Sequence, residues 1–115
     1  MIIKNVQVFT EEKRFQPGEI VIEDGIFKET ASNHDEIIDG NGCYAIPGLV
    51  DVHFHGAVGY DFCDGTEEAI REIAKYEASQ GITTIVPATM TLPEEELLHI
   101  AKTAGEHKNE EGAVL

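Results

Sequence analysis

Two histidines separated by one residue carry the strongest chemical signal in the sequence. His53 and His55 lie in PGLVDVHFHG, at positions 47–56, where a Pro-Gly turn leads into an apolar segment. If that segment is a strand, Asp51 and both imidazoles share one face, because side chains at i and i+2 point the same way. Two imidazoles about 7 Å apart along a strand can converge on one metal ion. The pattern predicts a metal site with His53 and His55 as ligands and Asp51 as a group that orients an imidazole N–H.

A histidine pair of this kind can also have a purely structural role. A buried imidazole often does no more than hydrogen-bond a neighbour. Three features favour a metal: the apolar strand of parallel type, the place of the histidines at its C-terminal end, and Gly56 next to them, which allows close backbone approach. A zinc site that adds Cys43 and Cys63 lacks a CxxC pair. The two cysteines fit better as small buried hydrophobic residues.

The segments around the pair alternate between strand and helix patterns. GLVDVHFH and GITTIVP read as strands, and each is followed by a helical pattern, TEEAIREIAKYEASQ and LPEEELLHIAKTAGEH. This alternation is typical of a parallel α/β fold. The closing GAVL resembles the start of a third strand, and parallel strands this few leave open sheet edges, so we expect a fragment of a larger fold.

Both helical patterns predict which residues are buried. Ile70, Ile73 and Ala74 form the apolar face of the first helix. In the second helix, Thr91 and Glu94 predict a capping box, and His99 lies off the apolar face. The residues predicted to be buried in the second helix are Leu97, Ile100, Ala101 and Ala104.

The first part of the chain, residues 1–46, reads as short strands joined by turns. Asp24-Gly25 predicts a hairpin within GEIVIEDGIFKE. The alternation before this turn predicts a half-buried strand with Ile20 and Ile22 on one face and Val21 on the other. SNHDE and DGNG read as loops. A segment this short needs another surface to pack against.

Charge and hydropathy exclude several classes of partner. Eight Lys and Arg stand against 22 Asp and Glu, for a formal net charge of −14, so the chain lacks the basic patch that nucleic acids or anionic membranes require. No run approaches the roughly 20 apolar residues of a membrane span. The N-terminus lacks the pattern of a secretory signal, which leads us to expect a cytoplasmic protein.

The motifs together resemble those of a known family. A small β-domain followed by PGLVDVHFHG looks like the amidohydrolase superfamily, whose HxH motif lies at the end of barrel strand 1. HFHGAVGYDFCDGT and GITTIVPATMT are similar to the N-acetylglucosamine-6-phosphate deacetylases of that superfamily. Dihydroorotases and hydantoinases usually continue differently after HxH. The resemblance covers nearly the whole chain and is most specific at positions 47–91.

The resemblance implies a fold and an activity. Residues 1–46 would be part of a β-sandwich, and residues 47–115 the first two βα units of a (β/α)₈ barrel. The intact protein would deacetylate N-acetylglucosamine 6-phosphate, with one or two divalent ions, Zn²⁺ or Fe²⁺, held by His53 and His55. No catalytic residue is expected within this chain, because the acid–base Asp and the remaining ligands would follow Leu115. We also expect a homo-oligomer, and no activity from these 115 residues alone.

Two alternatives remain open at this point. Another amidohydrolase, such as a cyclic-amide hydrolase or a deaminase, would share the metal ligands but act on a different substrate. A non-catalytic fragment could instead use the HxH pair only to stabilise its fold.

Overall fold

The structure, a computed structural model of the chain, describes residues 1–30 and 36–115. Two compact units make up the protein, Met1–Pro47 and Gly48–Leu115. The predicted loop SNHDE lies almost entirely outside the described residues. Within the described ranges, no helix has the length and apolar character needed to cross a lipid bilayer.

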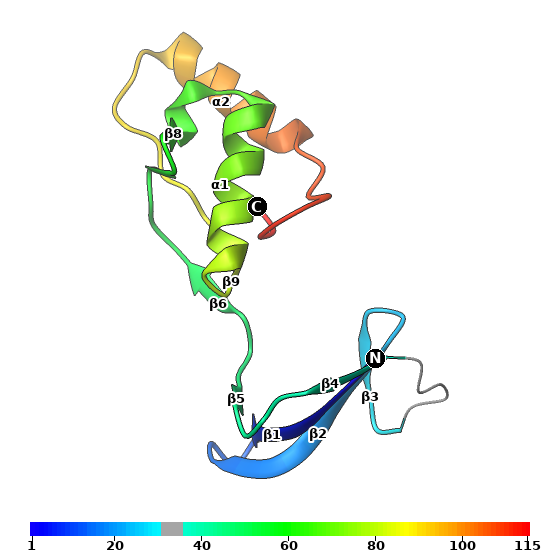
Figure 1. Cartoon of the computed structure of the whole chain (residues 1–115). Helices are drawn as coiled ribbons and strands as arrows, with labels where there is room; N and C mark the ends of the chain where they lie inside the picture. The colour runs from blue at the N-terminus through cyan, green and yellow to red at the C-terminus, as the bar shows by residue number, and fades with distance from the viewer. Residues whose placement is uncertain (31–35) are drawn as a thin grey trace. The chain divides into compact units, whose positions relative to one another are not determined.

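The first unit is built on one five-stranded sheet (Figure 1). β1 pairs antiparallel with β2, which pairs antiparallel with β3, while β4 and β5 both lie parallel to β1. The strands are β1 (Ile2–Phe9), β2 (Phe15–Glu23), β3 (Ile26–Lys28), β4 (Ile37–Asp39) and β5 (Tyr44–Ala45). The prediction of short strands and turns is therefore confirmed for the described part of this unit.

The hairpin predicted at Asp24-Gly25 joins β2 to β3. Both turn residues have positive φ, 53° and 72°, as a two-residue turn of type I′ requires. The strand form of β2 places Ile20 and Ile22 on one face and Val21 on the other, as predicted. Val21 is the buried residue, whereas Ile20 and Ile22 are only half-buried. The reason is that Val21 pairs with Ile2 of β1, which is itself buried, so the covered face of the sheet is set by this pair.

The second unit alternates strands and helices, so the chain as a whole is a mixed α/β protein. β6 and β9 pair in parallel, and Val114 forms a parallel bridge to Thr84 of β9, where a third strand is predicted. A two-stranded antiparallel ribbon, β7–β8, and a short 3₁₀ helix at Phe62–Asp64 precede the first long helix. The elements are β6 (Leu49–Asp51), β7 (Gly56–Ala57), β8 (Tyr60–Asp61), α1 (Glu67–Ser79), β9 (Ile82–Ile85) and α2 (Glu94–Glu106).

Helix α1 agrees with its prediction in position and in buried face. Thr66 caps it, with Oγ1 accepting a hydrogen bond from the Ala69 N–H at 3.2 Å. Ile70, Ile73 and Ala74 are almost fully buried. Ala74 packs with Ile85 of β9 and Ala113, and so joins the helix to the parallel strands.

Helix α2 is present, but two details of its prediction are wrong. It begins after Pro93, whose fixed φ suits a helix start, and no side chain caps it, so the Thr91–Glu94 capping box does not form. Ile100 is buried against Phe62 and Ile70, and Leu97 and Ala104 are half-buried. Ala101 is exposed, because only a narrow stripe of α2 meets the rest of the unit. His99 is exposed, as predicted.

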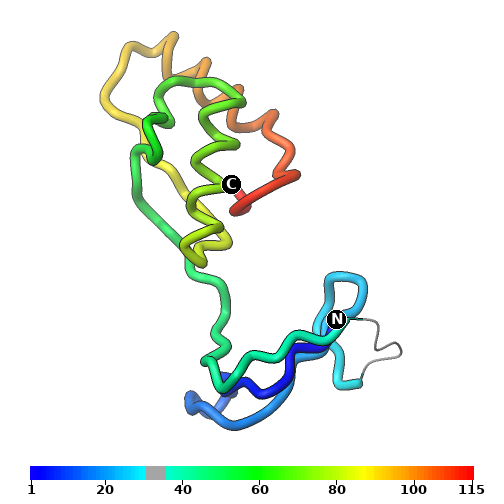
Figure 2. The backbone as a smooth tube through the Cα atoms, in the orientation of Figure 1, coloured from blue at the N-terminus to red at the C-terminus, as the bar shows by residue number. Residues whose placement is uncertain are grey.

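After α2 the chain returns along α1 to reach β9. Figure 2 shows this last segment, at the red end of the colour scale, lying beside α1. Two contacts hold it there: the Ala113 N–H donates to the Ala74 carbonyl at 2.9 Å, and Lys75 pairs with Glu111 at 2.7 Å. The segment therefore connects the far end of α2 to the parallel sheet.

Candidate functional site

The predicted metal ligands lie just past the end of a parallel strand. β6 ends at Asp51, so His53 and His55 belong to the irregular segment that follows it, and the predicted strand through His55 is too long. Irregular hydrogen bonds join this segment to the residues that follow β9. The Val86 N–H donates to the Asp51 carbonyl and the Ala88 N–H donates to the Phe54 carbonyl, both at 2.8 Å. These bonds fix the histidine segment beside the chain that leaves β9.

The two imidazoles lie next to each other. Their ring centroids are 5.2 Å apart and the ring planes meet at 85°, edge against face. His55 is half-buried and His53 is exposed. The structure therefore brings the two predicted ligands together at the C-terminal end of β6, which is the edge where parallel α/β folds bind ligands and metals.

A main-chain carbonyl from the neighbouring segment orients one of the rings. His55 Nδ1 lies 2.8 Å from the carbonyl oxygen of Ala88. Because a carbonyl only accepts, Nδ1 must carry the proton and donate. In the neutral ring this leaves Nε2 with its lone pair, and a histidine that binds a metal typically has its other nitrogen held in this way. The sequence gives no sign of this contact, since any residue at position 88 provides a carbonyl.

Asp51 acts on the backbone next to the rings. Its Oδ1 accepts a hydrogen bond from the main-chain N–H of His53 at 3.0 Å. The prediction had this carboxylate orient an imidazole, whereas the hydrogen bond found here fixes the main chain at the first histidine. Asp51 therefore holds the main chain of the irregular segment that follows β6.

The described residues contain no group of three or more His, Cys, Asp or Glu side chains arranged to bind a metal ion. Within residues 1–30 and 36–115, the two predicted ligands His53 and His55 are therefore not part of a larger group of this kind. Cys43 is exposed, contrary to the prediction that both cysteines are buried, and Cys63 is half-buried. Cys63 Sγ accepts a hydrogen bond from the Met90 N–H at 3.2 Å.

The β7–β8 ribbon and the 3₁₀ helix hold the histidine segment from the other side. The Phe62 N–H donates to the His55 carbonyl at 2.7 Å. Asp61 caps the 3₁₀ helix by accepting from the Cys63 N–H at 2.7 Å, and the Asp64 carboxylate accepts from the Asp61 N–H at 2.9 Å. Both acidic residues of the stretch HFHGAVGYDFCDGT therefore have a structural role in this unit.

Glu77 is a buried carboxyl on α1 that the sequence motifs did not single out. It follows Ile70, Ile73 and Ala74 on the buried face, so its spacing alone was a sufficient signal, and it is 6% exposed. Burial raises the pKa of the Glu77 carboxyl, and the negative charge of Asp51 raises that pKa further.

We expect Glu77→Gln to stabilise the protein at neutral pH. The unfolded chain releases the Glu77 proton near the ordinary pKa of 4.5, whereas the folded chain releases it only at higher pH. In the wild type, the contribution of Glu77 to stability is therefore fully present below the ordinary pKa of 4.5 and is lost as the pH rises through the raised pKa. A glutamine does not ionise, so the melting temperature of the variant should exceed that of wild type at pH 7 and converge with it near pH 4. The exposed Glu95→Gln is the matched control. A Glu77→Gln variant that melts below wild type at pH 7 would contradict this assignment.

The sequence of the chain is similar to those of two kinds of enzyme. No family model matches the chain. It is 33% identical over 93 residues to an adenine deaminase of Clostridium perfringens, covering 75% of this chain and 15% of that protein. It is 27% identical over 95 residues to an N-acetylglucosamine-6-phosphate deacetylase of Lysinibacillus sphaericus, covering 79% of this chain and 24% of that protein.

Solved structures show the same relationship. The chain matches N-acetylglucosamine-6-phosphate deacetylase of Thermotoga maritima with a TM-score of 0.74 and 27% identity, over 92% of this chain and 27% of that one. The deacetylase of Pasteurella multocida shares the fold, with a TM-score of 0.82 at 18% identity, over 96% of this chain and 32% of that one.

The matched length is a small part of each relative. The chain spans 15% of the adenine deaminase and 24% of the Lysinibacillus deacetylase. Over that span, sequence and fold agree with the resemblance read from the HxH strand and the segments after it. The predicted resemblance to the N-acetylglucosamine-6-phosphate deacetylase family, within the amidohydrolase superfamily, is therefore confirmed.

Proposed function

We propose that the intact protein is a metal-dependent amidohydrolase that removes the acetyl group of N-acetylglucosamine 6-phosphate. The observation that carries the proposal is the pair of adjacent imidazoles at the C-terminal end of β6, with His55 Nδ1 held by the Ala88 carbonyl. With its proton on Nδ1, the neutral His55 ring keeps a lone pair on Nε2, which is the form of imidazole that binds a metal. The similarity to deacetylases over about 95 residues supports the substrate.

In this proposal, His53 and His55 hold a divalent ion, Zn²⁺ or Fe²⁺, with one or two ions per site. A metal bound there would supply polarisation of the amide carbonyl and a lower pKa for the attacking water. The chain's own contribution is positioning. Asp51 fixes the main chain at His53, and the Ala88 carbonyl fixes the tautomer of His55. The acid–base Asp, the other ligands and the phosphate-binding groups would lie in regions of the intact protein that correspond to the parts of the relatives this chain does not span.

The same proposal assigns the two units. Residues 1–46 would form part of a β-sandwich, and residues 47–115 the first two βα units of a (β/α)₈ barrel. The parallel β6–β9 pair and the isolated parallel bridge between Val114 and Thr84 of β9 support the barrel. A homo-oligomer is also part of this proposal.

Adenine deamination is the second candidate. The specific observation in its favour is the 33% identity to the Clostridium adenine deaminase over 93 residues, compared with 27% to the Lysinibacillus deacetylase over 95. Both reactions need a metal-activated water, so the site described above serves either. Only the substrate-binding groups would differ.

A substrate panel on intact protein separates the two. We expect acetate from N-acetylglucosamine 6-phosphate, much less from the unphosphorylated sugar, and negligible turnover of dihydroorotate or hydantoins. The sugar without phosphate should react more slowly because binding energy from the remote phosphate positions the amide. Acetate and ammonia are measured on the same samples. Ammonia from adenine, with no acetate from the sugar phosphate, would replace the deacetylase by the second candidate.

A further inference from the structure

His107 is a buried histidine with one unused ring nitrogen. It follows α2, and only 3% of its side chain is exposed. Its Nδ1 lies 2.8 Å from Oε1 of Glu67, the first residue of α1. Because a carboxylate only accepts, Nδ1 carries a proton and donates to Glu67. The other nitrogen, Nε2, is buried and has no hydrogen-bond partner within residues 1–30 and 36–115. A buried polar atom without a partner is destabilising, and a ligand bound at this nitrogen would remove that cost.

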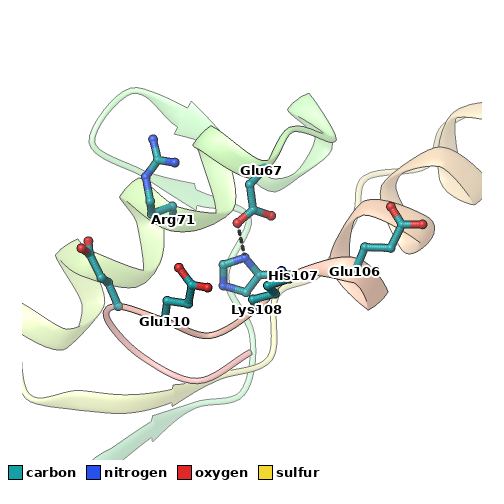
Figure 3. Close-up of a pocket in the computed structure, with 7 residues that line it drawn as sticks. Glu67, Arg71, Glu106, His107, Lys108 and Glu110 are labelled. Carbon is teal, nitrogen blue, oxygen red and sulfur yellow. Dashed lines mark hydrogen bonds and ion pairs between the residues drawn. The ribbon is translucent and has the colours of Figure 1, made fainter.

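The ring lies in the wall of a cavity of about 460 Å³ within the second unit. Figure 3 shows the ring between α1 and the segment after α2, with Glu67 at one nitrogen and the Glu110 carboxylate on the side of the ring that bears the other. Glu110 comes from the segment that returns along α1. The cavity is therefore lined by α1, the end of α2 and the chain that follows it.

The charges around the cavity favour a cation. Its lining carries four carboxylates against Arg71 and Lys108, and the carboxylates are Glu67, Glu106, Glu110 and Glu111. Glu111 is neutralised by Lys75 at 2.7 Å, and Glu106 lies 4.0 Å from Lys102. Glu67 is engaged by His107 itself. Glu110 is the carboxylate in the cavity for which the described residues provide no ion pair.

We propose that this cavity binds a divalent transition-metal ion through His107 Nε2 and the Glu110 carboxylate, with water completing the coordination. The pairing of a carboxylate with the far nitrogen of a ligating histidine is the usual way in which proteins orient such a ligand, and Glu67 provides it here. An imidazole ligand selects Zn²⁺, Ni²⁺ or Cu²⁺ over Ca²⁺ and Mg²⁺. Since no three metal-binding side chains are grouped in the described ranges, this is a two-ligand site of modest affinity. The proposal uses other residues than the HxH pair and does not depend on the proposed function.

The test removes the HxH pair first. In a His53→Asn/His55→Asn background, Zn²⁺ binding to the intact protein is followed by calorimetry, with Ca²⁺ as the comparison ion. We expect one Zn²⁺ to bind at this cavity and no binding of Ca²⁺ there. Adding Glu110→Gln or His107→Gln should weaken Zn²⁺ at least about tenfold, and Glu67→Gln should weaken it by a similar factor through loss of the orienting carboxylate. His99→Asn, an exposed histidine elsewhere on α2, should leave the affinity unchanged.

A second measurement guards against misfolding of the His107 variant. Glu110 is exposed, so Glu110→Gln should keep the fold, and circular dichroism checks each variant. Co²⁺ added to the background protein should broaden the NMR signals of the His107 ring and leave those of His99 unchanged. If the background protein binds no Zn²⁺, or if Glu110→Gln and His107→Gln bind it as the background does, the proposal is overturned. Because the HxH pair is absent from every sample, neither result bears on the proposed deacetylase site.

Discussion

Replacing both His53 and His55 by asparagine should lower the content of tightly bound metal and the rate of hydrolysis, each by at least about tenfold. Loss of the groups around a bound metal typically has an effect of this size. The physical reason is specific to this geometry. The rings are adjacent, with centroids 5.2 Å apart, and the proton on His55 Nδ1 is fixed by the Ala88 carbonyl. Asparagine keeps a polar side chain of moderate size, so the change removes the imidazole nitrogens with little disturbance of the half-exposed surface.

The measurement needs intact protein and two readouts. Metal is counted after dialysis against a chelator, which removes weakly held ions such as one at His107, and product release is followed under saturating substrate. The matched control is His99→Asn, which changes an exposed histidine on α2 away from the pair. Unchanged metal content and rate in the double variant would refute the assignment of these two residues as ligands.

The sequence predicted the elements that depend on local pattern. α1 and α2 show the 3.6-residue spacing of apolar side chains, and Asp24-Gly25 carries a turn signal that few other structures use. β9 and the strand start near Val114 follow from short apolar runs bounded by turns. In each of these cases a window of a few residues contains the whole signal, so tertiary contacts did not need to be known.

Features set by particular tertiary contacts were missed or misplaced. The strand at β6 was predicted through His55, yet it ends at Asp51, because beyond that residue its hydrogen bonds to the segment after β9 are irregular, from the Val86 N–H to the Asp51 carbonyl and from the Ala88 N–H to the Phe54 carbonyl. The β7–β8 turn places Val58 and Gly59 at φ of 49° and 88°. A β-branched valine strongly disfavours that region, so no propensity rule finds a turn there. The surrounding structure imposes it.

In the candidate site, too, the features set by local pattern were predicted and those set by tertiary contacts were not. The choice of His53, His55 and Asp51 came from spacing of two residues along one segment, and the structure places the imidazoles together. The groups that orient them lie far away in the sequence: the Ala88 carbonyl is 33 residues from His55. Glu67 and His107 are 40 residues apart. Contacts over such distances depend on how helices and strands pack, and no local pattern specifies them.

We expect Gly56→Ala to impair the histidine site by disturbing the β7–β8 ribbon that supports it. A Cβ at Gly56 would lie 2.2 Å from the Tyr60 carbonyl oxygen and 2.8 Å from the Asp61 Cα, so the backbone of β8 must move away from β7. This movement reaches the histidines directly, because Gly56 follows His55, whose carbonyl accepts the Phe62 N–H at 2.7 Å. A displacement of about 1 Å in a catalytic group can cost roughly a hundredfold in rate. Forcing a methyl into a packed site typically costs about 1–3 kcal/mol of stability.

Gly105→Ala provides the matched control for this change. Gly105 lies in α2, a Cβ there meets no atom within 4 Å, and alanine favours the helix by about 0.5–1 kcal/mol over glycine. The control should therefore keep its rate and unfold at higher urea, while Gly56→Ala loses most of its kcat/KM and unfolds at lower urea. If Gly56→Ala keeps the rate and stability of wild type, the β7–β8 ribbon does not position His55.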